Sequence, residues 1–300
     1  MTGEEDARRA MAKIPALAGY QGPLARLGGL TNLVFRAGDF VLRLPGPGTE
    51  EYINRKNEAV AARAAAMAGV SPEVLHADAE TGIMVTGYVA GAATMSPVLF
   101  RNRSGAAARA GEAFARLHRS KAIFPSRFEL FAMIDSYLEI LRGKDVMLPH
   151  GYHDVVAEAA SLRAALGRRP VPLAPCHCDP LCENFLDTGD RMWIVDWEYS
   201  GMNDPMWDLG DLSVEAQFDA NQDAAMLAAY FKGAPPEDDR ARMVIYKAMC
   251  DLLWTLWGLI QLANKNPAED FRTYADTRFA RCRALMATPT FAQSLAVLSR

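Results

Sequence analysis

The sequence predicts an α+β fold of two lobes, in which a small antiparallel sheet with one helix precedes a larger, mostly helical part. Alternating apolar and polar residues separated by turn signals indicate strands in the first ninety residues. Beyond Gly91 the pattern changes to long amphipathic or apolar segments that are typical of helices. A chain of 300 residues, half of them hydrophobic, is long enough for two such lobes. We therefore expect a smaller N-terminal lobe over residues 1–90 and a larger C-terminal lobe over residues 91–300.

Strand signals run through the first lobe. The alternating segments on either side of the turn dipeptide Gly38–Asp39 are typical of a β-hairpin. The residues Glu80–Gly82 form a second turn signal between two later segments. The five predicted strand segments are Ala25–Gly29, Thr31–Ala37, Phe40–Leu44, Glu73–Ala77 and Ile83–Val89.

One helix is expected between the third and fourth strands, so that the order is three strands, a helix and two strands. Thr49 is a candidate N-cap, the alanine-rich run Glu50–Met67 has high helix propensity, and Gly69 is placed to end it. The larger lobe is predicted to contain four long helices, namely Ala106–Ser120, Arg127–Leu141, Asp154–Leu166 and Asp239–Ala263.

The chemistry centres on Cys176–Glu198, where polar residues stand at fixed spacing around a short apolar strand. His177, Asp179 and Asn184 form the pattern H-x-D-x4-N, and Asp196 follows an apolar run at the point where a buried strand ends. This order suits phosphoryl transfer, in which one carboxylate takes the proton of an attacking hydroxyl. An amide and a second carboxylate then hold magnesium on a nucleotide. The segment therefore predicts a phosphoryl-transfer site with ATP and Mg²⁺ as cofactors.

Each residue of the motif has a predicted role. Asp179 is the candidate catalytic base, although an aspartate before a proline is also typical of an exposed loop. Asn184 and Asp196 are candidate metal ligands, because Mg²⁺ takes oxygen ligands and usually keeps several waters. Glu198 lies two residues after Asp196, on the same face of a strand, and is either a further metal ligand or an exposed surface residue. His177 is grouped with the catalytic residues but is expected to orient the loop, by a hydrogen bond to the backbone or to Asp196.

A second group of residues is expected to contact the nucleotide. Arg43 lies on the third strand and Glu58 on the helix that follows, so an Arg43 side chain held by Glu58 can contact phosphates. The alternative is an ordinary surface salt bridge. A Gly-Gly turn allows close approach of the backbone to phosphates. The residues of this turn expected to contact the nucleotide are Gly28, Gly29, Thr31 and Asn32. We therefore expect residues 1–90 to form a nucleotide-binding lobe and residues 91–300 to form a catalytic and substrate-binding lobe.

The region from Cys176 to Glu215 contains ten acidic residues against one basic residue, Arg191, which gives a formal charge of −9. This surplus predicts a cationic substrate, unless several of the acids, notably Asp187 and Asp190, are turn residues in water.

Two tryptophans, Trp254 and Trp257, stand three residues apart on an apolar helix and so share a face. Their spacing is typical of core packing, but beside acidic residues they also suit an aromatic wall for an ammonium group. Cation–π attraction contributes about 0.5–2 kcal/mol per ring.

The bulk composition excludes several classes of function. A net charge of −4 argues against a general nucleic-acid binder, which needs a basic face. The polar, acidic N-terminus has no apolar signal-peptide core, so we expect a cytoplasmic protein. The apolar stretch Met243–Ala263 contains Lys247 and Asp251 and is interpreted as a buried helix, not a membrane span. Three of the five cysteines lie beside His177 without a second ligand pair, which favours reduced thiols over zinc.

Several segments together resemble the choline/ethanolamine kinases, within the wider aminoglycoside-phosphotransferase and protein-kinase-like superfamily. The resemblance runs from about Gly28 to Phe279. The H-x-D-x4-N and D-x-E-Y pieces mark the superfamily, whereas WEYSGMNDPMWDLG and LLWTLWGLIQ point more narrowly to choline kinases. The other matching pieces are GGLTNLVFRA, FVLRLPG, NEAVAARAA, EVLHADAETGIMVTGYVAG, HCDPLCEN and YADTRF. The resemblance implies a bilobal protein-kinase-like fold.

The resemblance also implies roles for individual residues. It agrees with Asp179 as the base, Asn184 and Asp196 as magnesium ligands, and Arg43 as a nucleotide contact. It assigns Thr86, Gly87 and Tyr88 to the hinge whose backbone meets adenine. The chain departs from the family at Cys178, where choline kinases usually have Asn, and in the run Ala216–Phe218, where a family aromatic is replaced. The implied pocket for a quaternary ammonium consists of Tyr199, Glu215, Trp254, Trp257 and Tyr274.

We therefore expect an ATP- and Mg²⁺-dependent kinase that phosphorylates the hydroxyl of a small cationic amino alcohol, choline first or ethanolamine. The sequence does not decide the oligomeric state, and a homodimer is possible. Neither nucleic acid nor a membrane is expected as a partner. One alternative is a kinase of the same fold that acts on an aminoglycoside, thiamine or a sugar derivative, although paired tryptophans suit a compact ammonium better. The other is an inactive binding module, which should have lost the base or a metal ligand.

Overall fold

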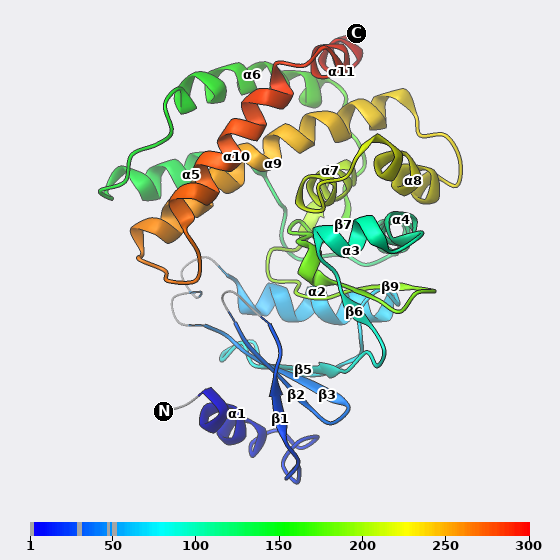
Figure 1. The fold of residues 1–300 in the computed structure, drawn as a ribbon, viewed down its shortest axis with the longest axis vertical. Helices are drawn as coiled ribbons and strands as arrows, with labels where there is room; N and C mark the ends of the chain where they lie inside the picture. Colours follow the sequence, from blue (N-terminus) through cyan, green and yellow to red (C-terminus); the bar gives the residue numbers. More distant parts are fainter. Residues whose placement is uncertain (1–2, 29–31, 47–48, 50–52) are drawn as a thin grey trace.

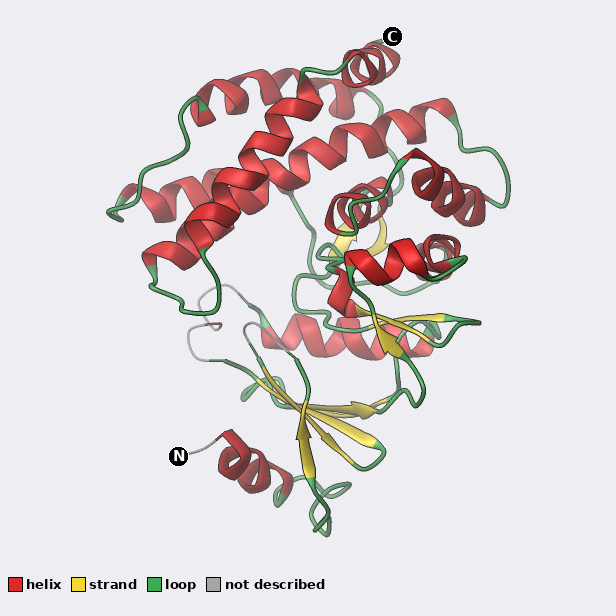
Figure 2. Ribbon diagram, viewed as in Figure 1, coloured by secondary structure: helices red, strands yellow, loops and turns green. Residues whose placement is uncertain are grey.

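The computed structural model describes residues 3–28, 32–46, 49 and 53–300, and it confirms the predicted α+β fold of two lobes (Figure 1). The smaller lobe is built around one antiparallel sheet, and the larger lobe is mostly helical (Figure 2). The last strand of that sheet ends at Gly87 and the first helix of the larger part begins at Pro97. The exact boundary near residue 90 stays a prediction.

The sheet of the smaller lobe has the strand order β1-β2-β3-β5-β4, with every neighbouring pair antiparallel. The predicted hairpin is confirmed, because Ala37 pairs with Phe40 across a turn in which Gly38 has φ of 63°. Only glycine adopts such a backbone without strain. The strands are β1 (Leu24–Arg26), β2 (Leu33–Ala37), β3 (Phe40–Leu44), β4 (Val74–Ala77) and β5 (Met84–Gly87).

Helix α2 (Arg55–Met67) follows β3, as predicted, but its predicted start is wrong. Asn54 is the N-cap, and its side chain accepts a hydrogen bond from the backbone of Asn57. Thr49, the predicted cap, instead donates its hydroxyl to the Gly46 carbonyl. An extended asparagine satisfies the free N–H groups of a first turn as well as threonine does, so the local signal was ambiguous. Gly69 follows the last turn with φ of 71°, as expected of a residue that ends a helix.

A helix that the strand and helix signals did not reveal covers the outer face of the sheet. Helix α1 (Gly3–Met11) places Ala7 and Met11 against Phe35 and Leu42 of the sheet. Figure 1 shows α1 on the side of the sheet away from the larger lobe and α2 on the side toward it. The sheet therefore has both faces covered, and α2 connects it to the core of the larger lobe.

The larger lobe is organised around one long buried helix, α9 (Glu237–Ala263), which packs against α5, α7, α10 and α11. It is long and apolar enough to cross a membrane, but most of its apolar window is buried inside the fold, as in the core helix of a globular protein. The remaining helices are α3 (Pro97–Asn102), α4 (Ala106–His118), α5 (Leu130–Arg142), α6 (Tyr152–Arg168), α7 (Met206–Glu215), α8 (Ala220–Phe231), α10 (Phe271–Met286) and α11 (Pro289–Ser299). The four predicted long helices are confirmed, with ends shifted by a few residues.

Two small sheets in the larger lobe carry the H-x-D-x4-N motif. Strand β7 (Ala174–Cys176) pairs with β10 (Gly201–Asn203), and β8 (Phe185–Asp187) lies between β6 (Ala93–Thr94) and β9 (Met192–Ile194). The motif occupies the loop after β7 and a single 3₁₀ turn before β8. Both ends of the motif are therefore anchored in hydrogen-bonded strands.

Packing between α4 and α8 depends on the absence of a side chain at Gly111. A Cβ there would lie 2.2 Å from the Met226 carbonyl oxygen, which is backbone and cannot rotate away. We predict that Gly111→Ala lowers the free energy of unfolding by at least about 2 kcal/mol through overpacking. Gly167→Ala is the matched control, since no atom lies within 4 Å of its added Cβ and it sits in a helix. Urea unfolding should show that this control is unchanged or more stable; equal stability of both variants would contradict the packing.

Candidate active site

The loop that carries His177 and Asp179 is held by one buried carboxylate. The backbone N–H groups of His177 and Cys178 donate to the two oxygens of Asp208, at 2.7 and 2.8 Å. The ring of His118 donates to the same carboxylate at 2.9 Å. Asp208 lies in the first turn of α7, where a negative charge is favoured by the helix dipole. The loop conformation is therefore fixed by charge-assisted hydrogen bonds to the Asp208 carboxylate.

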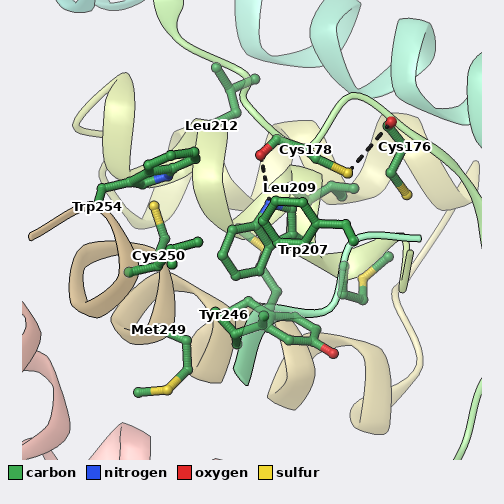
Figure 3. Close-up of a cluster of buried hydrophobic side chains, with 14 of the residues drawn as sticks. Cys176, Cys178, Trp207, Leu209, Leu212, Tyr246, Met249, Cys250 and Trp254 are labelled. Carbon is green, nitrogen blue, oxygen red and sulfur yellow. Dashed lines mark hydrogen bonds between the residues drawn. The ribbon is translucent and has the colours of Figure 1, made fainter. Parts of the chain in front are cut away.

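Cys178, the motif residue at which the chain was expected to depart from the resemblance, adopts a left-handed backbone with φ of 70°. Its carbonyl accepts a hydrogen bond from the Trp207 indole at 3.1 Å, and its thiol lies 3.6 Å from the Cys176 carbonyl (Figure 3). All three side chains are buried. Asparagine tolerates the left-handed region better than most residues. Here the same turn is held by packing around a small thiol.

His177 orients the loop through the backbone, which is one of the two alternatives that the sequence left open. Its Nε2 donates to the Val195 carbonyl at 2.9 Å, which connects the loop to the residue before Asp196. The ring is fully buried and packs edge-on to Trp197, with centroids 4.9 Å apart. Burial lowers the pKa of His177, so the ring is neutral at pH 7. This geometry fits a positioning role.

Asp179 follows the clamped backbone and is partly exposed to solvent. No basic side chain of the described residues lies within ion-pair distance of its carboxylate. Burial raises the pKa of Asp179 well above its usual value, and the charges of Asp211 and Asp196 raise it further. A carboxylate with a raised pKa and no ion-pair partner suits a group that accepts a proton during a reaction.

Asn184 ends the 3₁₀ turn that follows this loop, and Asp196 comes two residues after the end of β9. The amide nitrogen of Asn184 donates to the Asp179 carbonyl at 3.0 Å, which leaves its amide oxygen without a hydrogen bond from the described residues. Asp196 was expected on a strand, sharing a face with Glu198, and this is wrong. Strand β9 ends at Ile194 and Asp196 has a left-handed backbone, with φ of 67°.

The carboxylates nevertheless converge. Oxygens of Glu58, Asp196 and Glu198 lie within 4.8 Å of one another. Arg43 pairs with Glu58 and lies 3.3 Å from Asp196, while Arg55 bridges Glu58 at 2.9 Å and Glu198 at 3.0 Å. Burial and the neighbouring Asp196 charge raise the pKa of Glu198 to about 7. The surface-salt-bridge interpretation of Arg43 and the surface interpretation of Glu198 are therefore wrong, since these side chains are largely buried.

The turn residues assigned to nucleotide contacts differ in their surroundings, since Asn32 is buried and hydrogen-bonded whereas Gly28 is exposed. The Asn32 amide donates to Glu198 at 3.2 Å and accepts from the Gly46 backbone at 3.4 Å, so it connects the turn to the acidic cluster. Gly28 is exposed, with open space where a Cβ would stand. Gly29 and Thr31 lie outside the described residues.

At the predicted hinge, Thr86 pairs with Val41 in the sheet. The N–H groups of Gly87 and Tyr88 already donate to the carbonyls of Glu73 and Asp39, at 2.9 and 2.8 Å. These two N–H groups cannot meet adenine without breaking those hydrogen bonds.

Four of the residues assigned to an ammonium pocket form one aromatic cluster. Ring centroids of Tyr199 and Trp254 are 5.5 Å apart, those of Trp254 and Trp257 are 6.4 Å apart, and those of Trp257 and Tyr274 are 5.8 Å apart. The cluster joins residues from the loop after β9, from α9 and from α10. The fifth residue, Glu215, is already paired with a buried arginine.

The acidic surplus between Cys176 and Glu215 is mostly neutralised by bases from other parts of the chain. The alternative interpretation was that Asp187 and Asp190 are turn residues in water. This is wrong for Asp187, which is fully buried between two arginines, and correct for Asp190, which is exposed. Most of the other acids also have a basic partner. The pairs are Asp187 with Arg103 and Arg109, Asp196 with Arg43, Glu198 with Arg55, Asp204 with Arg242, Asp208 with His118, and Glu215 with Arg278.

Comparison with known proteins fits this geometry. The model of the phosphotransferase enzyme family (APH) matches residues 24–246. The crystal structure of a choline/ethanolamine kinase family protein from Mesorhizobium loti is 68% identical, with a TM-score of 0.93 and 99% of both chains covered. This chain belongs to the choline/ethanolamine kinase family.

More distant members of the choline/ethanolamine kinase family have the same fold. The choline kinase LicA from Streptococcus pneumoniae is 26% identical, with a TM-score of 0.78 over 98% of this chain and 99% of LicA. A structure of LicA in complex with AMP is 26% identical, with a TM-score of 0.73 over 97% of this chain and 98% of that chain. The predicted resemblance and the predicted enzyme class, a phosphotransferase, are confirmed.

Three residues that the sequence analysis of this choline/ethanolamine kinase family protein did not assign to the site connect the parts of that site. Asp208 fixes the loop, Arg55 bridges the acidic cluster, and Arg278 pairs with Glu215. One signal was available, since Asp208 stands inside the apolar run Met206–Leu209 and a buried acid needs partners. The partners of the two arginines are far away in sequence, and no local pattern reveals them.

The raised pKa of Asp179 makes a prediction about stability. Between the ordinary and the raised pKa, the folded protein binds more protons than the unfolded protein, so stability falls as pH rises through the raised value. Asp179→Asn cannot ionise, and its thermal midpoint should exceed that of the wild type by an amount that grows as the pH rises above the usual pKa of an aspartate, about 4. Asp190→Asn is the control, because the Thr188 hydroxyl lowers the pKa of that exposed carboxyl. A pH-independent difference for Asp179→Asn in differential scanning calorimetry would contradict the raised pKa.

Proposed function

We propose that this protein is an ATP- and Mg²⁺-dependent kinase that phosphorylates the hydroxyl of a small cationic amino alcohol, choline or ethanolamine. The observation that carries the proposal is the position of Asp179. Its carboxylate has no ion-pair partner among the described residues, lies on a loop fixed by Asp208, and has a pKa that burial and the charges of Asp211 and Asp196 raise. Asp196 belongs to the acidic cluster, and Asp211 hydrogen-bonds to the Trp254 indole of the aromatic cluster.

Asp179 is the group that meets the substrate hydroxyl. Its carboxylate orients the hydroxyl and accepts the proton as the new bond to phosphorus forms. The clamped backbone of His177 and Cys178 keeps the carboxylate in place, so no free energy is spent on ordering the loop during the reaction.

The residues that fit magnesium are Asn184 and Asp196, with Glu198 behind them. The free amide oxygen of Asn184 and the partly exposed carboxylate of Asp196 are hard oxygen donors, which Mg²⁺ prefers. Bound Mg²⁺ would offset charge on the phosphates of the nucleotide. In this proposal Arg43, held by Glu58, contacts those phosphates, and the LicA complex with AMP supports an adenine nucleotide.

A compact ammonium is the cation that best fits the aromatic cluster. Tyr199, Trp254 and Trp257 present ring faces and edges within a few ångströms of one another. Ring faces attract a quaternary or primary ammonium by cation–π interaction, and this attraction is stronger where water is excluded. The names of the choline/ethanolamine kinase family protein from Mesorhizobium loti and of LicA agree with such a substrate.

The proposal is tested by an ATP-consumption screen over choline, ethanolamine, thiamine and an aminoglycoside, each with and without Mg²⁺. We predict turnover with choline or ethanolamine, loss of turnover when Mg²⁺ is replaced by EDTA, and little consumption with the other two alcohols. Asp179→Asn, which is expected to fold stably, is the matched blank and should show turnover lower by several orders of magnitude. Preferred turnover of the aminoglycoside or thiamine, or equal turnover by Asp179→Asn, would overturn the proposal.

A further inference from the structure

The charge of Glu215 is already used inside the protein. The Arg278 guanidinium donates to the Glu215 carboxylate and lies 4.6 Å above the ring of Tyr274. Arg278 is buried, so its charge must be matched by partners within the fold. A second acid, Asp251, lies 3.2 Å from Arg278, but Asp251 also receives two hydrogen bonds from Arg281, at 2.6 and 3.1 Å. Arg278 is therefore the partner on which Glu215 depends.

Asp211 is the acid of this region that has no such partner. It stands one helical turn before Glu215 on α7, on the same face, and its side chain is almost completely buried. Its carboxylate accepts from the Cys250 thiol at 2.9 Å and from the Trp254 indole at 3.5 Å. No basic nitrogen of the described residues lies within 4 Å of it. Two arginines face three acids here, and Asp211 is the acid left without an arginine. Burial and the charge of Glu215 raise the pKa of Asp211 well above its usual value, as expected of a carboxyl that lacks a cation.

Asp211 also connects the two halves of the site. Trp254 and Cys250, which both bond to Asp211, project side by side from α9 toward α7 (Figure 3). Trp254 is the central ring of the aromatic cluster, between Tyr199 and Trp257. Asp208, which holds the backbone of the residue before Asp179, stands three residues before Asp211 on α7, so the two acids share a face of that helix. Asp211 is thus the acid of the aromatic cluster that lies one turn along α7 from the support of the base.

This position matches the shape of the substrate class. In choline and ethanolamine only two methylene groups separate the charged nitrogen from the hydroxyl. A hydroxyl at Asp179 therefore places the ammonium close by, on the side of the loop that α7 supports through Asp208. Glu215 is farther along α7, and its charge is matched by Arg278.

We propose that Asp211, and not Glu215, is the carboxylate that pairs with the ammonium group of the substrate, and that Arg278 removes Glu215 from this role. The inference rests on the proposed function and assigns its charge selectivity to one residue. Trp254 then has two tasks, since its ring faces the cation while its N–H holds the Asp211 carboxylate. Alcohols with a positive charge two carbons from the hydroxyl are selected over neutral alcohols of the same shape.

The test uses a neutral molecule of the same shape as choline. Initial rates are measured with saturating ATP for choline and for its carbon isostere, 3,3-dimethylbutan-1-ol, in the wild type, Asp211→Asn and Glu215→Gln. The wild type should prefer choline in kcat/KM. In Asp211→Asn this preference should fall at least tenfold, through a higher KM for choline, while the KM for ATP changes less than threefold. In Glu215→Gln the preference should stay within threefold of the wild type, although its thermal midpoint falls because Arg278 loses a partner.

A preference that falls in Glu215→Gln and stays in Asp211→Asn, or that falls equally in both, overturns the inference. A general structural defect would lower the rates with choline and with the isostere alike and leave their ratio unchanged, which also counts against it. Asp211→Ala is the second uncharged variant if Asp211→Asn folds poorly. Absence of wild-type turnover with both choline and ethanolamine would instead overturn the proposed function, and this inference with it.

Discussion

The site depends on the Asp208 carboxylate, which accepts hydrogen bonds from two consecutive backbone N–H groups of the loop after β7. Its other contact, the His118 ring, is in turn bonded to the Tyr230 hydroxyl, so helices α4, α7 and α8 all support one loop. A buried carboxylate with several charge-assisted hydrogen bonds is rigid, because losing any one of them leaves an unsatisfied buried group. The next residue, Asp179, therefore points in a fixed direction although it has no ion-pair partner of its own.

Charge in this protein is balanced across long sequence distances. Arginines from β3, α2 and α10 reach the acids that follow β7, and these ion pairs offset part of the apparent surplus. Buried charges are tolerated only when they are paired, so the acids left without a base indicate where a ligand or a reaction supplies the missing charge. Among the described residues of the site, Asp179 and Asp211 are in that position. One lies where a hydroxyl would be activated, and the other lies against the aromatic cluster.

Local patterns predicted those features that are determined by local physics. The β-hairpin around Gly38, the end of α2 at Gly69 and the buried character of α9 follow from turn geometry, left-handed backbone and hydrophobic content. The resemblance of the motif segments also identified the family correctly.

The failures have one physical cause, which is that tertiary partners override local periodicity. Asp196 leaves the strand because its backbone turns into the left-handed region, so the two-residue period that linked it to Glu198 does not apply. The formal charge between Cys176 and Glu215 overestimated the field, since the compensating arginines lie up to 153 residues away in the sequence. Whether Glu215 faces a substrate or Arg278 depends on how α7 and α10 pack, and no spacing in the sequence encodes that.

The most direct test of the central role of Asp208 is the turnover of Asp208→Asn with choline or ethanolamine, measured beside the affinity for ATP. An amide keeps one acceptor oxygen but turns an N–H₂ group toward a loop N–H, which costs about 1.5–3 kcal/mol per charged hydrogen bond lost. The account predicts that kcat falls at least tenfold while the dissociation constant for ATP changes less than threefold. Wild-type kcat in a folded Asp208→Asn protein would contradict it.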